Sequence, residues 1–221
     1  RDFMKEGAFS MHVVVSGNCR AATDTDLETI RAATAKFGGE EIPNSIPKAV
    51  RADPFKPLNG ILGPDGDRWA ALNAKLGHSG AIALMQDTEA LLDSYKDRME
   101  AHGVFMTRLM IAIGQNFFSY EPVFHWFDEW FPVHKRTPEP SHLKTLKEPE
   151  PNPEASALVA EMREKVVAIF TKHGAASNQI GKTYPYHDSL LPETARVIDG
   201  IKNLLDPEGT VNPGALGFKE H

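Results

Sequence analysis

The chain of 221 residues has a single cysteine, no long apolar run and no excess of positive charge. One cysteine, Cys19, excludes a disulfide within the chain and a metal site built from several thiolates, and it fits a reducing, cytoplasmic setting. No apolar run approaches the roughly 20 residues that a membrane-spanning helix needs, so no membrane span is expected. The formal net charge is -6 and the lysines and arginines are scattered, which argues against nucleic acid as a partner.

Familiar catalytic motifs are missing as well. The sequence contains no G-x-S-x-G, no Walker-type phosphate loop, no H-E-x-x-H and no G-x-G-x-x-G. What remains is a chain of ordinary globular composition, 41% apolar and 24% charged, long enough to bury a substantial core. Motif spacing alone therefore assigns no activity.

Alternation and helical spacing predict an α+β fold. Strands are expected at 8–17, 68–79 and 104–114, a loop with at most one short strand at 40–67, and helices at 24–37, 87–103, 153–173 and 192–205. The first helix would be capped by Thr23 or Asp24, and the last would turn Ile198, Ile201 and Leu205 inward. This order favours a mainly antiparallel, ferredoxin-like sheet covered by helices, followed by a helical C-terminal segment.

Composition divides the chain into three regions. They are an α+β sheet region (1–131), a proline-rich loop (132–153) and a helical C-terminal segment (154–221). Six prolines between Pro132 and Pro153 mark the loop as irregular. No internal repeat is present, so these regions are not copies of one unit.

An aromatic-rich block at 116–136 holds eight of the 19 aromatic residues. It is either core or a subunit interface, as in a homodimer, or the wall of an apolar substrate pocket. Tyr120 and His125 are the pocket candidates, because each combines a ring with a polar tip. A metal-dependent hydrolase is a further alternative, because two imidazoles and a carboxylate, from His125, His134 and Asp128, could bind a metal ion. Their spacing fits neither one face of a helix nor the familiar zinc sites.

A second polar stretch, SNQIGKTYPYH at 177–187, follows an expected helix end. Tyr184, Tyr186 and His187 are candidates for proton transfer or hydrogen bonding to a substrate. The alternative is a loop whose tyrosines pack and whose polar groups cap neighbouring helices. Spacing alone does not separate these two readings.

Two C-terminal stretches together resemble a known family. GAASNQIGKTYPYH (174–187) and LLDPEGTVNPGALGF (204–218) are similar to the C-terminal end of the vanillyl-alcohol oxidase, or FAD-linked oxidase, superfamily, which includes glycolate oxidase subunits, D-lactate dehydrogenases and 4-cresol dehydrogenase. RWAALNAKLGHS (68–79) also looks like the segment opening the second half of that family's cap domain. Within the second stretch, Pro207 helps to stop a helix and Gly209 tolerates a left-handed turn.

The resemblance implies that the chain is the C-terminal cap, or substrate, domain of an FAD-dependent oxidoreductase. Such an enzyme oxidises an alcohol, a 2-hydroxy acid or an alkylphenol by hydride transfer to the flavin. FAD would be bound mainly by an N-terminal domain of the same polypeptide, so this chain alone is expected to be inactive. The start at Arg1-Asp2-Phe3-Met4 fits such a fragment. The alternative is a non-catalytic ligand-binding or dimerisation module.

The resemblance also implies roles for single residues. Tyr184 and His187 match the family's Tyr and His and are expected to be catalytic, while Pro185 stands where phenol-oxidising members have Arg. The metal-binding segments of the 2-hydroxy-acid branch do not occur, so no metal is expected. Substrate contacts are expected from Arg68, Arg108, Tyr120, His125 and Tyr186, the arginines through a carboxylate. Cofactor contacts are expected from His78, Asn178, Asn212, Pro213 and Gly214.

Overall fold

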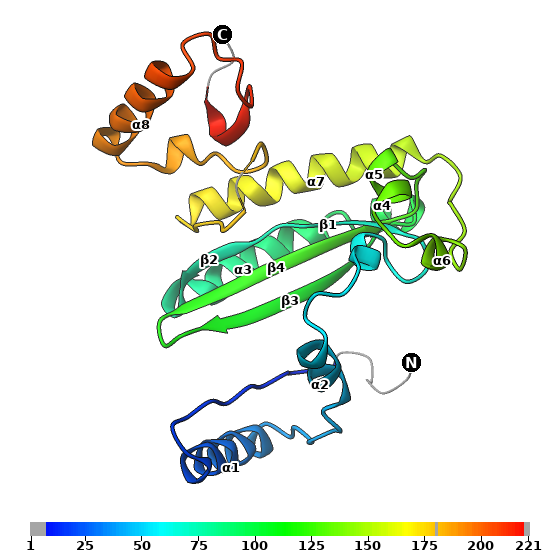
Figure 1. Cartoon of the computed structure of the whole chain (residues 1–221), viewed down its shortest axis with the longest axis vertical. Helices are drawn as coiled ribbons and strands as arrows, with labels where there is room; N and C mark the ends of the chain where they lie inside the picture. Colours follow the sequence, from blue (N-terminus) through cyan, green and yellow to red (C-terminus); the bar gives the residue numbers. More distant parts are fainter. Residues whose placement is uncertain (1–7, 180, 219–221) are drawn as a thin grey trace. The chain divides into compact units, whose positions relative to one another are not determined.

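The computed structural model describes residues 8–179 and 181–218 (Figure 1) and separates two units, Arg1–Lys56 and Pro57–His221. Arg1–Met4, which suggested a fragment, lie outside the described residues. Within the described ranges, no helix is both long enough and apolar enough to cross a membrane.

The first unit contains helices α1 (Arg20–Lys36) and α2 (Ser45–Ala52). The predicted strand at 8–17 is wrong: these residues pair with no strand among the residues that the structure describes, and Phe9 is 78% exposed. Alternation suits a strand, but an unpaired strand leaves its backbone groups without ladder partners. α1 forms as expected, although its N-cap is Cys19 rather than Thr23 or Asp24.

The region 40–67 is not simply a loop. It contains α2 and the short 3-10 helix η1 (Leu58–Ile61), and no strand. Pro47 misled the prediction because proline usually interrupts a helix. Here it lies in the first turn of α2, where the backbone N–H groups have no partner within the helix.

The second unit contains an antiparallel sheet of β1 (Arg68–Ala71), β2 (Ala74–Gly77), β3 (Phe105–Ile113) and β4 (Phe117–Trp126). β4 is central, with β3 along one side and β1 and β2 in one continuous register along the other. The α+β class and the strands expected at 68–79 and 104–114 are confirmed, although the first strand ends at Gly77. β4 was not predicted as a strand.

The break between β1 and β2 has a local cause in the partner strand. Leu72 donates its N–H to the carbonyl of Pro122 at 3.0 Å, and Pro122 has no N–H to return. One ladder bond is therefore missing at the middle of the edge strand.

The described residues of this unit form six α-helices: α3 (His78–Asp93), α4 (Lys96–Ala101), α5 (Pro132–Arg136), α6 (Pro140–Leu143), α7 (Pro153–Lys172) and α8 (Pro192–Leu205). α7 begins as predicted, with the Asn152 side chain accepting from the Ala155 N–H at 3.1 Å. The helix predicted at 87–103 is wrong at its start and is two helices. α3 already begins at His78, and its buried Ala81, Leu84, Thr88 and Leu92 carry the helical spacing.

The core lies between α3, α7 and one face of the sheet. Because successive residues of a strand point to opposite faces, the even-numbered residues of β4 share this side. Tyr120 and Phe124 are fully buried there with Leu84 and Met162. This part of the aromatic block is therefore core.

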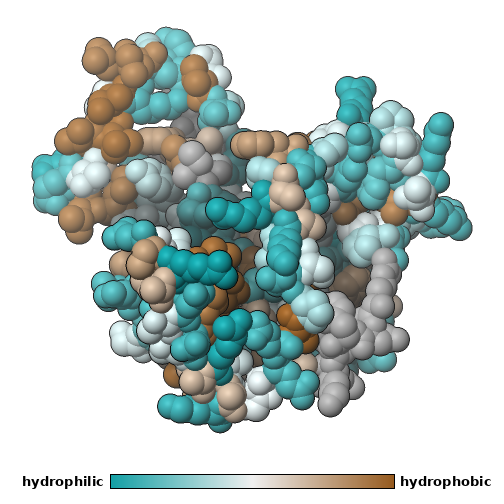
Figure 2. Space-filling view, turned by 60° about the horizontal axis from the view of Figure 1, so that its bottom comes forward, coloured by the Kyte–Doolittle hydropathy of each residue, from teal (hydrophilic) through white to brown (hydrophobic). Residues whose placement is uncertain are grey.

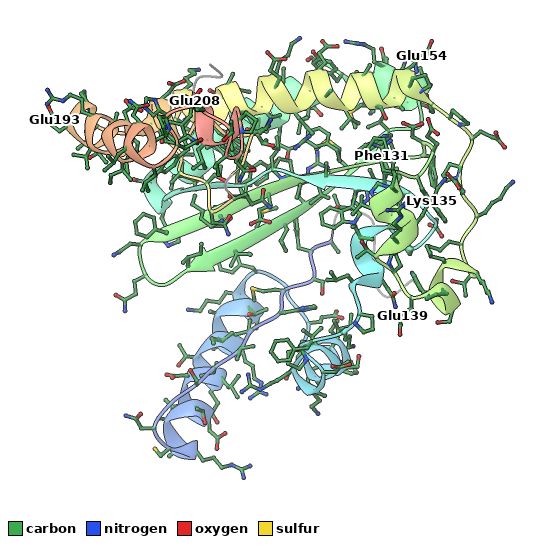
Figure 3. The ribbon with its side chains drawn as sticks, turned by 45° about the horizontal axis from the view of Figure 1, so that its top comes forward. Phe131, Lys135, Glu139, Glu154, Glu193 and Glu208 are labelled. Carbon is green, nitrogen blue, oxygen red and sulfur yellow. The ribbon has the colours of Figure 1, made fainter. Side chains whose placement is uncertain are left out.

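α8 forms as predicted, but its apolar side is not turned inward. Ile201 is 51% and Leu205 76% exposed, and Ile198 is half-buried. In Figure 1, α8 lies beyond α7, away from the sheet. Figure 2 shows hydrophobic residues gathered over this helix at the upper left. In Figure 3, Glu193 marks its start and Glu208 the turn that follows.

Candidate functional site

The sheet face opposite α3 and α7 is called the open face. It carries the odd-numbered residues of all the strands, which the register aligns in rows across the sheet. The rows are Trp69–His125–Phe105, Ala71–Val123–Thr107, Asn73–Glu121–Leu109, Lys75–Ser119–Ile111 and Gly77–Phe117–Ile113. β3 contributes an apolar side, with Leu109 49% and Ile111 42% exposed. Polar residues lie on the edge strand and β4.

Lys75 is the centre of a polar group on this face. Its Nζ lies 2.9 Å from Asn178 Oδ1, 3.3 Å from Ser119 Oγ and 3.4 Å from Asn73 Oδ1. Glu121 Oε1 is 3.8 Å away. These five residues are called the Lys75 cluster. Asn73 and Ser119 are buried, so the cation lies in a partly desolvated setting where its interactions are stronger than in water.

Tyr184 reaches the Lys75 cluster from the C-terminal loop. Its Oη accepts the Asn73 N–H at 2.6 Å, and Asn73 Oδ1 accepts from Ser177 Oγ at 3.0 Å and from the Asn178 N–H at 3.1 Å. Burial raises the pKa of the Tyr184 phenol, so the hydroxyl is neutral at physiological pH. Of the residues predicted for the site, the structure brings Tyr184 and Asn178 together here.

His125 lies at the other end of the open face. Its Nδ1 is 2.8 Å from Asp67 Oδ2, its Nε2 is 3.0 Å from Thr107 Oγ1, and the Phe105 ring stacks on it. His125 and Ser119 are six residues apart on β4, which corresponds to roughly 20 Å along a strand. His125 and the Lys75 cluster are therefore two separate polar positions on one face.

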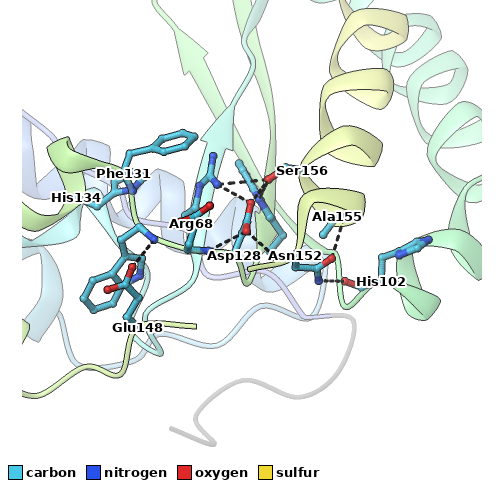
Figure 4. Close-up of polar contacts among 12 residues, drawn as sticks. Arg68, His102, Asp128, Phe131, His134, Glu148, Asn152, Ala155 and Ser156 are labelled. Carbon is cyan, nitrogen blue, oxygen red and sulfur yellow. Dashed lines mark hydrogen bonds and ion pairs between the residues drawn. The ribbon is translucent and has the colours of Figure 1, made fainter. Parts of the chain in front are cut away.

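The two arginines predicted to bind a carboxylate point to the other side of the sheet. Arg68 Nη1 donates to Asp128 Oδ2 at 2.8 Å, and its guanidinium lies 3.9 Å from the centre of the Phe131 ring (Figure 4). Asp128 also accepts the Asn152 N–H at 2.6 Å. Arg68 thus joins the strand, the loop after β4 and the start of α7.

Arg108 is similarly engaged by the protein itself. Its Nη2 lies 2.6 Å and its Nε 2.9 Å from the two oxygens of Glu89 on α3. Tyr120 donates its hydroxyl to the same carboxylate. Burial raises the pKa of Tyr120, which keeps the hydroxyl protonated. Tyr120 therefore belongs to a helix-side network, away from the open face.

The C-terminal tail folds back on the loop 181–187. Leu216 donates its N–H to Gly181 O at 2.5 Å, and the Phe218 ring lies 5.4 Å from that of His187. His187 Nε2 is 2.8 Å from Asp199 Oδ1. Positive φ values at Asn212 (50°) and Gly214 (71°) produce the reversal. The predicted cofactor contacts at 212–214 lie in this reversal, and the tail residues next to His187 are Gly217 and Phe218.

A surface pocket of about 510 Å³ lies between α7 and this folded tail. Val167 and Thr171 line it from α7, Tyr184 and Pro185 from the loop, and Gly217 from the tail. Tyr184 therefore lies between this pocket and the Lys75 cluster. His78 stands elsewhere, at the start of α3, with its ring 6.4 Å from that of Phe118. Tyr186 is partly exposed in the same loop as Tyr184.

The structure does not support the hypothesis of a metal-dependent hydrolase, which requires His125, Asp128 and His134 to share one metal ion. His125, Asp128 and His134 each have a different partner: Asp67, Arg68 and the Phe131 N–H. Over residues 8–179 and 181–218, no group of three or more His, Cys, Asp or Glu side chains is placed to hold a metal ion.

Sequence reasoning missed Lys75, Glu121, Ser119, Asp67 and Thr107. A signal for three of them was present: Asn73-x-Lys75 and Ser119-x-Glu121 place polar residues two apart between buried apolar neighbours, as on one face of a strand. No local pattern links Asp67 or Thr107 to His125, since only the strand register brings them together.

Comparisons with family models, with curated proteins and with solved structures give no match to this chain. The family resemblance therefore depends on the motifs at 68–79, 174–187 and 204–218, and the function is argued from where the fold places them.

Proposed function

We propose that this chain is the substrate-binding cap part of an FAD-dependent oxidoreductase. The observation that supports it is that two of the segments carrying the family resemblance are adjacent in space. Lys75 exchanges backbone hydrogen bonds with Ala176 at 2.7 and 2.9 Å, and Tyr184 bonds to Asn73. Residues more than 100 positions apart thus form one polar site at the edge of an apolar sheet face.

The order of elements supports a ferredoxin-like topology for the cap part. An edge strand, α3, β3, β4 and α7 follow one another, and the Lys75–Ala176 bridge then adds an antiparallel pairing on the outer side of the edge strand. A ferredoxin-like β-α-β-β-α-β unit would have its last strand at this place.

The residues present fit one part of a flavin nucleotide. Lys75 and Asn178 would hold polar atoms of the cofactor ring or the substrate, while the apolar side chains of β3 would cover a planar ring. The sequence has no glycine-rich phosphate loop, so the pyrophosphate would be bound by another part of the polypeptide. When bound, FAD supplies the hydride acceptor.

Charge placement favours an uncharged substrate, an alcohol or an alkylphenol, over a 2-hydroxy acid. Arg68 and Arg108 have carboxylate partners on the helix side, and Lys75 has Glu121 beside it. A substrate carboxylate would have to compete with these internal carboxylates. The neutral phenol of Tyr184 is suited to donating a hydrogen bond to a substrate oxygen.

The exposed apolar residues of β3 also favour a second candidate, a dimerisation module. Phe105, Leu109, Ile111 and Ile113 are each between 38% and 49% exposed on one strand. An apolar sheet face of this kind is buried in many homodimers. This candidate requires no flavin.

Expression of the complete gene separates the two candidates. The oxidoreductase proposal expects a yellow protein with the two visible absorption bands of a bound flavin, which FAD addition strengthens if the cofactor is partly lost. A colourless, folded protein that is unchanged by FAD and elutes as a dimer would favour the second candidate.

A further inference from the structure

Three side chains on the open face form a hydrogen-bonded chain from a buried carboxylate to an exposed hydroxyl. Asp67 is 1% exposed and His125 is partly buried, whereas Thr107 is exposed. The two links measure 2.8 Å, from Asp67 Oδ2 to His125 Nδ1, and 3.0 Å, from His125 Nε2 to Thr107 Oγ1. The three residues come from the loop before β1, from β4 and from β3.

The direction of the hydrogen bonds follows from the chemistry of the end groups. An ionised carboxylate only accepts, so His125 Nδ1 carries the hydrogen that Asp67 accepts. Nε2 is then left with a lone pair and accepts the Thr107 hydroxyl hydrogen. The oxygen of Thr107 keeps its own lone pairs toward solvent, available to another hydroxyl.

Surrounding groups hold this arrangement in place. The Phe105 ring stacks on His125 with centroids 4.8 Å apart and planes within 10°. Trp69 is the cross-strand partner of His125 on the other side. The Asp67 carboxylate lies close to the Gly63 backbone, where a Cβ would stand only 2.0 Å from its Oδ1, and the Gly63 N–H donates to the Asp67 carbonyl at 2.8 Å. The imidazole therefore has little freedom to turn away from Thr107.

We propose that Asp67, His125 and Thr107 form the proton acceptor for the substrate hydroxyl, a role that rests on the proposed function. The substrate O–H proton passes to Thr107 Oγ1 while the Thr107 proton passes to His125 Nε2. The electron pair left on the substrate oxygen would form the carbonyl, and FAD, when bound, would supply the acceptor for the hydride of the carbinol carbon. The alcohol loses one proton and one hydride, and Asp67 balances the imidazolium charge.

In this arrangement Thr107 is the catalytic residue and touches the substrate, whereas His125 and Asp67 are positioning residues that act through it. Tyr184 is less suited to accept the proton, because burial raises its pKa and it already accepts the Asn73 N–H. Phe105, 43% exposed and two residues before Thr107 on β3, places apolar surface beside the hydroxyl, and Trp69, 41% exposed, lies on the far side of His125. An apolar or aromatic group on the carbinol carbon matches that surface.

The first test reads the tautomer of His125 in the present chain and needs no flavin. Nitrogen chemical shifts of the imidazole, assigned with His125→Gln, should show hydrogen on Nδ1 and none on Nε2. Asp67→Asn can present its amide hydrogens to Nδ1 and should move the hydrogen to Nε2. A wild-type ring that carries its hydrogen on Nε2 would overturn the proposal.

The second test uses the complete enzyme and follows anaerobic reduction of the flavin by an aryl alcohol. Thr107→Val keeps the shape but removes the hydroxyl and should slow reduction by about 100-fold or more. Thr107→Ser keeps the hydroxyl, so its rate of flavin reduction should remain within about threefold of the wild-type rate. Loss of an acid–base group would slow the reaction far more than this. A flavin-bearing enzyme whose Thr107→Val variant is reduced at the wild-type rate would overturn the relay alone. A flavin-free protein would overturn the proposed function, and the relay with it.

Discussion

Tyr184 and Asn73 join the C-terminal loop to the edge strand of the sheet. The phenol oxygen lies 2.6 Å from the Asn73 nitrogen and accepts its hydrogen. Leu72 donates toward β4, so the next N–H along the strand, that of Asn73, points away from the ladder and needs a partner elsewhere. Tyr184 supplies that partner and thereby sets the position of the loop beside the Lys75 cluster.

Replacing Tyr184 by Phe should lower the free energy of unfolding by about 1–3 kcal/mol, because the Asn73 N–H loses its acceptor. Chemical denaturation measures this change. Tyr186→Phe, in the same loop but partly exposed, is the matched control and should have little effect. In the complete enzyme, Tyr184→Phe should also slow flavin reduction. Equal stability of the two variants would show that the Asn73 contact is not made.

Lys75 and Glu121 should be energetically coupled, since they are close together on the open face and each side chain is only about one fifth exposed, at 21% and 19%. A double-mutant cycle of Lys75→Met and Glu121→Gln should give a coupling free energy of about 0.5–3 kcal/mol. Denaturant unfolding of the four proteins measures it. Strictly additive effects would mean that the pair is separated in solution.

Arg68 should contribute to stability more than to substrate binding. Arg68→Met leaves the buried Asp128 without its cation and should cost about 3–5 kcal/mol of unfolding free energy. The exposed Arg196→Met is the control and should change stability by less than about 0.5 kcal/mol. An unchanged KM for the folded Arg68→Met enzyme is expected. A strongly raised KM would instead restore Arg68 as the substrate ligand that the sequence predicted.

The turn after α8 should loosen at low pH. Lys202 and the backbone N–H groups of Val211 and Thr210 bond to the Asp206 carboxylate, and these contacts lower its pKa to about 2. Because the folded pKa lies below the unfolded value, the stabilisation is complete above about pH 4 and is lost as the pH falls through about 2. The protection factor of the Val211 amide, which is its intrinsic exchange rate divided by its observed rate at the same pH, should fall over that interval.

Two substitutions check the source of this pH effect. Asp206→Asn should lower the protection factor of the Val211 amide at every pH. Glu208→Gln, exposed in the same turn, should leave that protection factor as in the wild type. A Val211 amide that remains protected in Asp206→Asn would show that the carboxylate does not hold the turn.

A strand or helix was predicted correctly where its sequence pattern was clear and the fold also supplies a strand or a buried surface for it to pair or pack with. Within the segment 104–114, Phe105–Ile113 pairs continuously with β4, and α7 has both its cap and its buried spacing in the sequence. Alternation at 8–17 was equally regular but finds no pairing partner in the structure. β4 was not predicted because proline is unusual in a central strand and Pro122 lies in the middle of this one. The many aromatic residues around it also made the alternation of apolar and polar residues hard to recognise.

The candidate site was less predictable than the fold. Tyr184 was a candidate from the polar stretch 177–187 and Asn178 from the family resemblance, and the two meet at Asn73. Lys75 and Glu121 depend on which face of the sheet is buried, which only tertiary packing decides. Asp67 and His125 are 58 positions apart, and only the register of β1 on β4 brings them within 2.8 Å.

The most direct test of the central claim is anaerobic addition of an aryl alcohol to the complete gene product, followed by its visible spectrum. The account predicts that the flavin bands are present and bleach in the wild type. A protein without flavin, or flavin bands that the alcohol leaves unchanged, would contradict the claim that this chain forms the substrate site of an alcohol-oxidising flavoenzyme.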